Sequence, residues 1–125
     1  MTTLHRTALL LIAHGSRRAE ANADLEDLAG KVRERGVYRH VQAAYLELCS
    51  PDIVAGGVSC VEAGAEKVIL LPYFLSAGVH VVDDLTAARD ELAKRFPGAK
   101  FLLAEPLGRH PLLTEIVLER AAAAH

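Results

Sequence analysis

The feature that most constrains the fold is a regular alternation of short, almost wholly apolar runs with longer segments of helical periodicity. The apolar runs cover residues 8–13, 40–46, 68–71 and 100–104. The periodic segments follow them at residues 19–35, 51–64, 81–95 and from 111 onward. Because apolar strands separated by helices are typical of a sheet covered on both faces, the pattern predicts a parallel α/β fold.

Right-handed connections between such strands predict a flavodoxin-like three-layer sandwich. We expect a four-stranded parallel sheet with the order 2-1-3-4. The length of 125 residues suits one domain covering residues 1–125, with no linker, repeat or low-complexity tract. A hydrophobic content of 51% with 5% aromatic residues predicts a largely aliphatic core.

Several helix boundaries and packing faces are also predicted. Ser50 is expected to cap the second helix with Pro51 at its first position, and Gly64 to end it. The adjacent Gly56 and Gly57 cost helix propensity, about 1 kcal/mol each, which suggests close packing. The last helix is expected to turn four apolar residues inward: Leu112, Leu113, Ile116 and Val117.

Charge and composition exclude several classes of protein. A net charge of -2 and a pI of about 6.3 argue against nucleic-acid binding, which usually needs a basic surface. No apolar run approaches the roughly 20 residues that span a membrane, and the first run is too short for a signal peptide. We therefore expect a cytoplasmic protein. Cys49 and Cys60 form no metal-binding or iron–sulfur motif and are expected to be small buried apolar residues.

The chemistry is expected at the carboxyl ends of the strands, where ligands bind in open parallel sheets. His14 follows the first strand, and His80 ends the loop after the third. Two imidazoles at one crevice would suit a transition metal, and a helix start beside His80 would favour its neutral, ligating form. Glu47, after the second strand, is either a solvated carboxylate or a proton acceptor or weak metal ligand.

The other polar residues near this edge carry weaker signals. Arg17 and Arg18 are either solvent-facing or partners of substrate carboxylates. His110 is expected to be a polar residue at the start of the last helix. The remaining histidines lie at the opposite edge or in the tail and are given no role: His5, His40 and His125.

These loops resemble the small CbiX-type sirohydrochlorin cobalt and iron chelatases, the class II chelatases. The resemblance spans nearly the whole chain and rests on four stretches. They are Leu-Leu-Ile-Ala-His14-Gly-Ser-Arg, Tyr-Leu-Glu47-Leu-Cys-Ser-Pro51, Leu-Pro-Tyr-Phe-Leu-Ser-Ala-Gly78-Val-His80-Val-Val-Asp-Asp and Pro-Leu-Gly-Arg-His110-Pro. The third stretch is the most specific of the four.

The resemblance implies a metal chelatase, a lyase that inserts cobalt, iron or nickel into sirohydrochlorin. His14 and His80 would hold the metal and, with Glu47, form the catalytic set. The implied substrate-binding residues are Ser16, Arg17, Arg18, Phe74, Leu75, Gly78 and Val79. The metal would be a substrate, with no organic cofactor. Because longer chelatases carry two such domains around one cleft, the resemblance also implies a homodimer.

Two alternative functions remain open from the residues. One is a metal-binding or metal-carrier protein without catalysis, which would bind metal without changing the absorption spectrum of a tetrapyrrole. A histidine phosphatase also places His-Gly after its first strand, but an anion-binding Arg would be expected where Ala13 stands. The sequence does not assign the roles of base and ligand between the two histidines, nor choose among the three metals.

Overall fold

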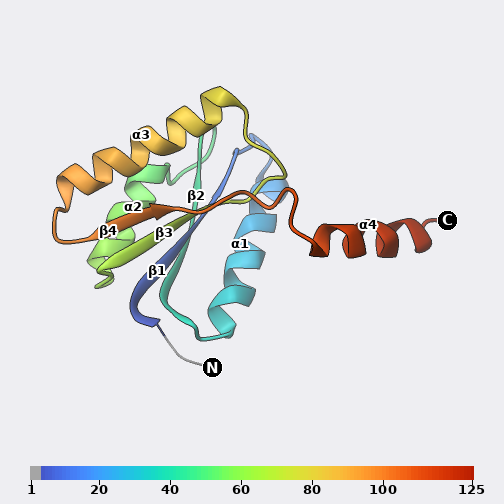
Figure 1. Cartoon of the computed structure of the whole chain (residues 1–125), viewed down its shortest axis with the longest axis horizontal. Helices are drawn as coiled ribbons and strands as arrows, with labels where there is room; N and C mark the ends of the chain where they lie inside the picture. Colours follow the sequence, from blue (N-terminus) through green and yellow to red (C-terminus); the bar gives the residue numbers. More distant parts are fainter. Residues whose placement is uncertain (1–3) are drawn as a thin grey trace.

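The computed structural model describes residues 4–125 and contains a four-stranded parallel sheet with helices on both sides (Figure 1). The strands are β1 (Leu4–Ala13), β2 (Tyr38–Tyr45), β3 (Lys67–Pro72) and β4 (Lys100–Leu103). The helices are α1 (Ala19–Glu34), α2 (Ile53–Glu62), α3 (Val79–Arg95) and α4 (Leu112–Ala122). The sheet order is β2-β1-β3-β4, so the predicted α/β class and the predicted order are both confirmed.

The central strand β1 is buried on both faces. Leu10 and Ile12 belong to the core shared with α2 and α3, while Leu9 and Leu11 pack in the core beneath α1. Figure 1 shows α2 and α3 on one side of the sheet and α1 on the other. The part of β1 from Ala8 to Ala13, which is apolar at every position, therefore lies between two helical layers, as its sequence predicted.

The paired glycines of α2 let this helix approach both the sheet and α3. A Cβ atom on Gly56 would press against Leu10 and Ala44, and one on Gly57 would overlap the side chain of Leu92 in α3. Their cost in helix propensity is thus offset by close packing. The close packing that the sequence suggested is confirmed.

The start of α2 differs from the prediction. The N-cap is Asp52, whose side chain accepts a 2.8 Å hydrogen bond from the Ala55 N–H. Pro51 lies before the helix, joined to Ser50 by a cis peptide bond, and its carbonyl oxygen accepts a hydrogen bond from the Tyr45 N–H. Assigning Ser50 as the cap was therefore wrong, because Pro51 is engaged by β2 and Asp52 is an equally suitable cap.

The packing predicted for the last helix is also wrong. The side chains of Leu112 and Val117 are 62% and 63% exposed, because α4 extends away from the rest of the molecule (Figure 1). The connection before it is tied to the sheet edge by a 3.0 Å hydrogen bond from the Leu107 N–H to the Phe74 carbonyl. This tether directs the helix outward. Among residues 4–125, no helix is both long and apolar enough to cross a membrane.

Candidate functional site

Loops from three neighbouring strands meet at the carboxyl edge of the sheet. The Glu47 N–H after β2 donates a 3.0 Å hydrogen bond to the His14 carbonyl after β1. The Tyr73 N–H after β3 donates to the Ile12 carbonyl in β1. Main-chain bonds therefore hold these loops side by side, as predicted for loops that leave adjacent parallel strands.

The His14 imidazole is exposed and lies against the ring of Phe74, with 4.6 Å between ring centroids and an interplanar angle of 32°. Phe74 is half-buried and packs on the core beneath α3. The contact with Phe74 therefore supports the imidazole ring, and the exposure of His14 leaves its ring nitrogens accessible at this edge of the sheet. Phe74 contacts His14 directly, a relation that the sequence did not predict.

Gly15 allows the loop after β1 to pass close to the loop after β2. Its φ of +95° lies in the left-handed region that favours glycine, and a Cβ atom there would collide with the Glu47 carbonyl oxygen. The main chain beside Glu47 is thus placed by contact with Gly15. The Glu47 side chain itself is exposed at the same edge.

A polar clamp orders the next residues of this loop. The Asn22 side chain in α1 accepts a 2.9 Å hydrogen bond from the Ser16 N–H and donates one of 2.8 Å to the Ser16 carbonyl. The Tyr45 hydroxyl donates to the Asn22 carbonyl at 3.0 Å. Burial, followed by the nearby Glu26 and Cys49, raises the pKa of Tyr45, so its hydroxyl stays protonated as this donor. The clamp thus fixes Ser16 relative to α1.

A hollow of about 280 Å³ opens beside His14. Residues from the loops and from α1 line it, including His14, Ser16, Asn22, Tyr45 and Tyr73. A second hollow of about 310 Å³ lies along the neighbouring loops and is lined by residues that include Leu75, Glu105 and Arg109. Both hollows open at the carboxyl edge, where ligands of open parallel sheets bind.

Exposed apolar and cationic side chains surround these hollows. Leu75, in the loop after β3, and Val79, the first residue of α3, are 63% and 76% exposed. Arg17 and Arg18 are exposed, and neither side chain forms an ion pair or hydrogen bond within residues 4–125. The edge thus offers apolar contact area together with free guanidinium groups, which suits a flat ligand that carries carboxylates.

His80 lies in the first turn of α3, two residues after the N-cap Gly78, and is exposed. The helix starts at Val79, two residues earlier than expected, and the predicted placement of His80 at a helix start is confirmed. Within the described residues, no three side chains of His, Cys, Asp or Glu form a group able to hold a metal. Shared coordination of one ion by His14 and His80 therefore stays a prediction.

Comparison with known proteins decides the family. The family model described as CbiX matches residues 8–124. The chain belongs to the CbiX family. Sirohydrochlorin ferrochelatase of Arabidopsis thaliana is 37% identical over 112 residues, which are 90% of this chain and 50% of the relative. Sirohydrochlorin cobaltochelatase of Methanopyrus kandleri is 29% identical over 90% of this chain and 93% of the relative.

A solved structure resembles the CbiX chain in fold. It is the sirohydrochlorin chelatase SirB from Bacillus subtilis subspecies spizizenii in complex with cobalt, with a TM-score of 0.86 and 24% identity. The match covers 94% of this chain and 50% of that one. This chain thus spans about half the length of the plant relative and of the bacterial structure, and nearly the full length of the archaeal relative.

The sequence-predicted residues of the CbiX site fall into two groups. The structure joins His14 to Phe74 by a ring contact and to Glu47 by a main-chain hydrogen bond, and it holds Ser16 in the same loop through Asn22. The others lie exposed on the surrounding loops and on the start of α3: Arg17, Arg18, Leu75, Gly78, Val79 and His80. Their roles in binding metal or substrate stay predictions.

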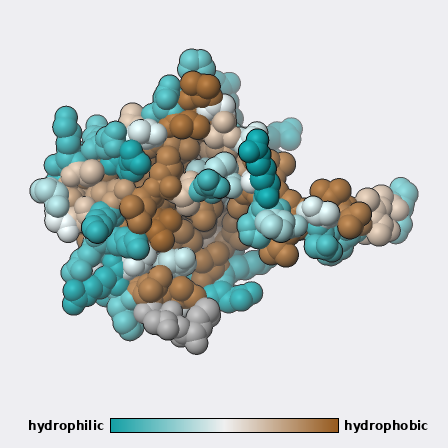
Figure 2. Space-filling model, viewed as in Figure 1, coloured by the Kyte–Doolittle hydropathy of each residue, from teal (hydrophilic) through white to brown (hydrophobic). Residues whose placement is uncertain are grey.

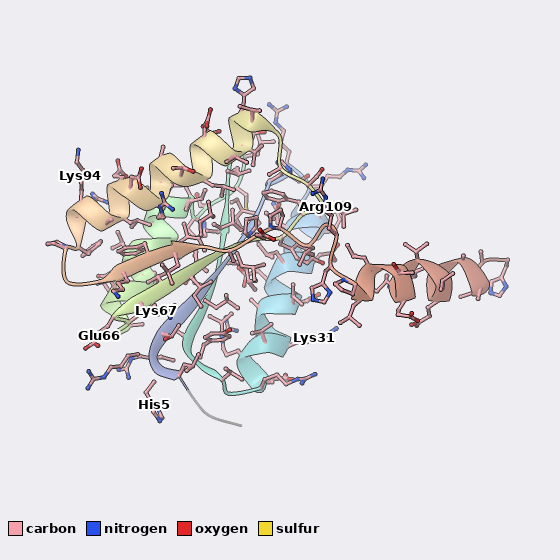
Figure 3. All side chains as sticks on the ribbon, viewed as in Figure 1. His5, Lys31, Glu66, Lys67, Lys94 and Arg109 are labelled. Atoms are coloured by element: carbon pink, nitrogen blue, oxygen red, sulfur yellow. The ribbon has the colours of Figure 1, made fainter. Side chains whose placement is uncertain are left out.

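Two residues of this edge escaped the sequence analysis. Asn22 has no sequence signal, because its partners are main-chain groups of Ser16 and the hydroxyl of Tyr45. Arg109 had a signal in the Gly-Arg-His sequence after β4. It is exposed in a left-handed conformation with φ of +68°, at the end of the sheet opposite His5 (Figure 3).

The expected role of His110 as a polar residue at the start of the last helix is confirmed, because its Nδ1 accepts a 3.1 Å hydrogen bond from the Leu112 N–H.

Proposed function

We propose that this CbiX chain inserts a divalent metal ion, cobalt, iron or nickel, into sirohydrochlorin. The observation that carries the proposal is the exposed His14 imidazole, supported on Phe74 at an edge with open apolar and cationic side chains. The curated relatives, named as sirohydrochlorin chelatases, support the same substrate. The metal is a substrate here, and the expected lack of an organic cofactor stays a prediction.

The chemistry requires a held metal ion, a held macrocycle and the removal of two pyrrole protons. In this proposal the neutral imidazoles of His14 and His80 bind the ion without the tight coordination that would prevent its release. Glu47, exposed beside the His14 loop, accepts a proton. The apolar faces of Leu75 and Val79 contact the ring.

The acidic periphery of the macrocycle would be bound by arginine. Arg17 and Arg18 lie in the same loop as His14, after Gly15 and Ser16, and their guanidinium groups are free to pair with acetate and propionate groups of the ring. The clamp between Ser16 and Asn22 holds the main chain that carries them. Ser16 therefore contributes to substrate binding chiefly through this main chain, and Gly78, which has open space where a Cβ would lie, allows the ring to approach closely.

The same proposal includes a homodimer in the cytoplasm. One copy offers two candidate imidazoles, and no group of three metal ligands exists within residues 4–125. A flat macrocycle has two faces, so a second copy would supply the opposite wall of the cleft. The archaeal relative named as a cobaltochelatase is covered over 93% of its length, which supports a single-domain chelatase.

The proposal is tested by removing each histidine in turn. We expect His14→Ala and His80→Ala to abolish the spectral change that accompanies cobalt insertion into sirohydrochlorin, while circular dichroism stays that of the native fold. His5→Ala is the matched control, because His5 lies at the opposite end of the sheet (Figure 3). It should retain the full rate. Near-normal rates in both site variants would refute the assignment, and metal binding without any spectral change would indicate a carrier protein.

A further inference from the structure

The loop after β4 is fixed against the loop after β3, beside the candidate metal ligand. The Leu107 N–H donates a 3.0 Å hydrogen bond to the Phe74 carbonyl, and Phe74 is the residue that supports the His14 ring. Gly108 lies so close to the Leu75 carbonyl oxygen that a Cβ atom would collide with it. The loop after β4 is therefore held at the same edge as the site, although it leaves the outermost strand of the sheet.

A turn in this loop places an arginine in a conformation that few side chains adopt. The turn is closed by a 3.2 Å hydrogen bond from the His110 N–H to the Leu107 carbonyl. Arg109 is its third residue, with φ of +68°, a value for which turns usually carry Gly or Asn. Backbone strain of this kind is imposed by the surrounding structure and clusters at binding and active sites.

The Arg109 side chain borders the hollow of about 310 Å³ together with Leu75, Ser76 and Ala77. Arg109 is exposed, and its side chain forms no ion pair or hydrogen bond within residues 4–125. The small neighbours leave room for a flexible acidic arm, and the exposed Leu75 offers apolar contact to the ring that carries the arm. Figure 3 shows Arg109 at the carboxyl end of the sheet, and Figure 2, drawn from the same side, shows hydrophobic surface across the middle of the molecule.

We propose that Arg109 and this hollow bind a carboxylate on the periphery of the tetrapyrrole, on the side of the ring away from Arg17 and Arg18. The assignment rests on the proposed function, because it gives one part of that substrate a binding site. A guanidinium presents paired N–H donors that match the two oxygens of a carboxylate. Arg17 and Arg18 follow β1, whereas Arg109 follows β4, two strands further across the sheet. At about 4.8 Å per strand, the ends of these strands are roughly 10 Å apart, so one flat ring can contact both.

A carboxylate of the protein already lines the same hollow. Glu105 is exposed there and forms no ion pair with Arg109. Its negative charge repels an acidic arm that enters the hollow, while the charge of Arg109 attracts the arm. Substitutions of the two residues should therefore change binding in opposite directions, which a purely structural role of the loop would not produce.

The subsite is tested by titrating the full chain with metal-free sirohydrochlorin in the presence of a chelator and following the absorption spectrum. Arg109→Gln should raise the Kd roughly fivefold, the size expected for a partly exposed ion pair. Arg109→Lys should raise it less, because lysine keeps the charge but loses the paired donors. Glu105→Gln should lower the Kd roughly twofold. Lys94→Gln removes the same charge at the far end of the molecule and should leave the Kd unchanged (Figure 3).

Arg109→Gly separates binding from folding. Because glycine favours the left-handed region, this variant should unfold at a higher urea concentration than the unmodified chain and still bind sirohydrochlorin more weakly. In cobalt insertion, the KM for sirohydrochlorin should rise in both the Gln and the Gly variants, with kcat within about twofold of the unmodified chain.

Three results would overturn the subsite. They are an unchanged Kd in Arg109→Gln and Arg109→Gly, an equal loss of affinity in Lys94→Gln, and weaker binding in Glu105→Gln. Failure of the chelatase proposal would look different: the unmodified chain would bind sirohydrochlorin through Arg109 but insert no metal. An unmodified chain that does not bind sirohydrochlorin would overturn both.

Discussion

At the scale of single residues, the site depends on main-chain contacts more than on side-chain pairs. His14 is supported by the Phe74 ring, but the strand end that carries it is placed by hydrogen bonds between neighbouring loops. Gly15 is the critical position, since its left-handed φ and the adjacent Glu47 carbonyl leave no room for a side chain. Ser16 is then held by Asn22.

Gly15→Ala should destabilise the protein and slow metal insertion. A side chain in this conformation costs roughly 1–3 kcal/mol, and relief of the collision would displace the loop that carries Glu47. Urea unfolding measures the loss of stability, and the spectral change of the macrocycle measures the rate. Gly98→Ala is the control, because nothing lies within 4 Å of the Cβ position and its φ is not left-handed. Equal stability of the two variants would contradict this account of Gly15.

At the scale of elements, α2 shows how packing outweighs local propensity. Two consecutive glycines weaken an isolated helix, yet in α2 they permit contact with Leu10 below and with Leu92 of α3 beside it. The helix begins at the Asp52 cap, which satisfies the Ala55 N–H. The position of α2 therefore follows from its neighbours as much as from its own sequence.

The same substitution in two helices should have opposite effects. Gly57→Ala should destabilise the protein by roughly 1–3 kcal/mol, because the added methyl overlaps the fully buried side chain of Leu92. Gly30→Ala in α1 should stabilise it by roughly 0.5–1 kcal/mol, because nothing lies within 4 Å and alanine favours the helix. Chemical unfolding of both variants checks the signs. Two changes in the same direction would contradict the packing role of Gly57.

The cap of α2 can be identified by a pair of alanine variants. Asp52→Ala should lower the free energy of unfolding by about 1 kcal/mol, because the Ala55 N–H loses its acceptor. Ser50→Ala should leave stability within about 0.5 kcal/mol of the unmodified chain. Thermal or urea unfolding measures both. A larger loss from the serine variant would show that Ser50 is the cap.

At the scale of the whole molecule, the two cysteines report on different parts of the fold. Cys60 is 0% exposed in the core between the sheet and the helices α2 and α3, and burial raises the pKa of its thiol to about 12. Cys49 is half-buried in the loop after β2. Both thiols are free. The predicted burial is confirmed for Cys60 and wrong for Cys49, because Cys49 lies in a loop, where its thiol is 3.5 Å from the Ser50 carbonyl oxygen.

Thiol labelling should therefore separate local from global opening. In the native protein only the thiol of Cys49 should react with a thiol-specific reagent, because Cys49 is half-buried whereas Cys60 is fully buried. Cys60 is 0% exposed, and burial raises the pKa of its thiol, so it should react only through unfolding. Mass spectrometry of labelled peptides, with and without urea, distinguishes the two. Rapid native labelling of Cys60 would contradict a closed core.

Much of the architecture was predictable because it depends on local pattern. A strand buried on both faces must be apolar at nearly every position, as β1 is from Ala8 to Ile12. Because connections between parallel strands are right-handed, few orders of the strands in the sheet were possible. Once the strand order was known, His14, Glu47 and the loop of His80 could be placed together at the carboxyl edge of the sheet.

The sequence by itself determined the parallel sheet, its order and the loops that carry the candidate chemistry, since apolar periodicity and chirality act over short stretches of chain. Only the tertiary structure decided the outward direction of α4, the capping by Asp52, the clamp of Asn22 on Ser16 and the support of His14 by Phe74. Each of these depends on contact or competition between groups in different segments. The pattern of α4 predicted a face packed inward, whereas the helix leaves the sheet edge after the connection held at Leu107 and stays exposed.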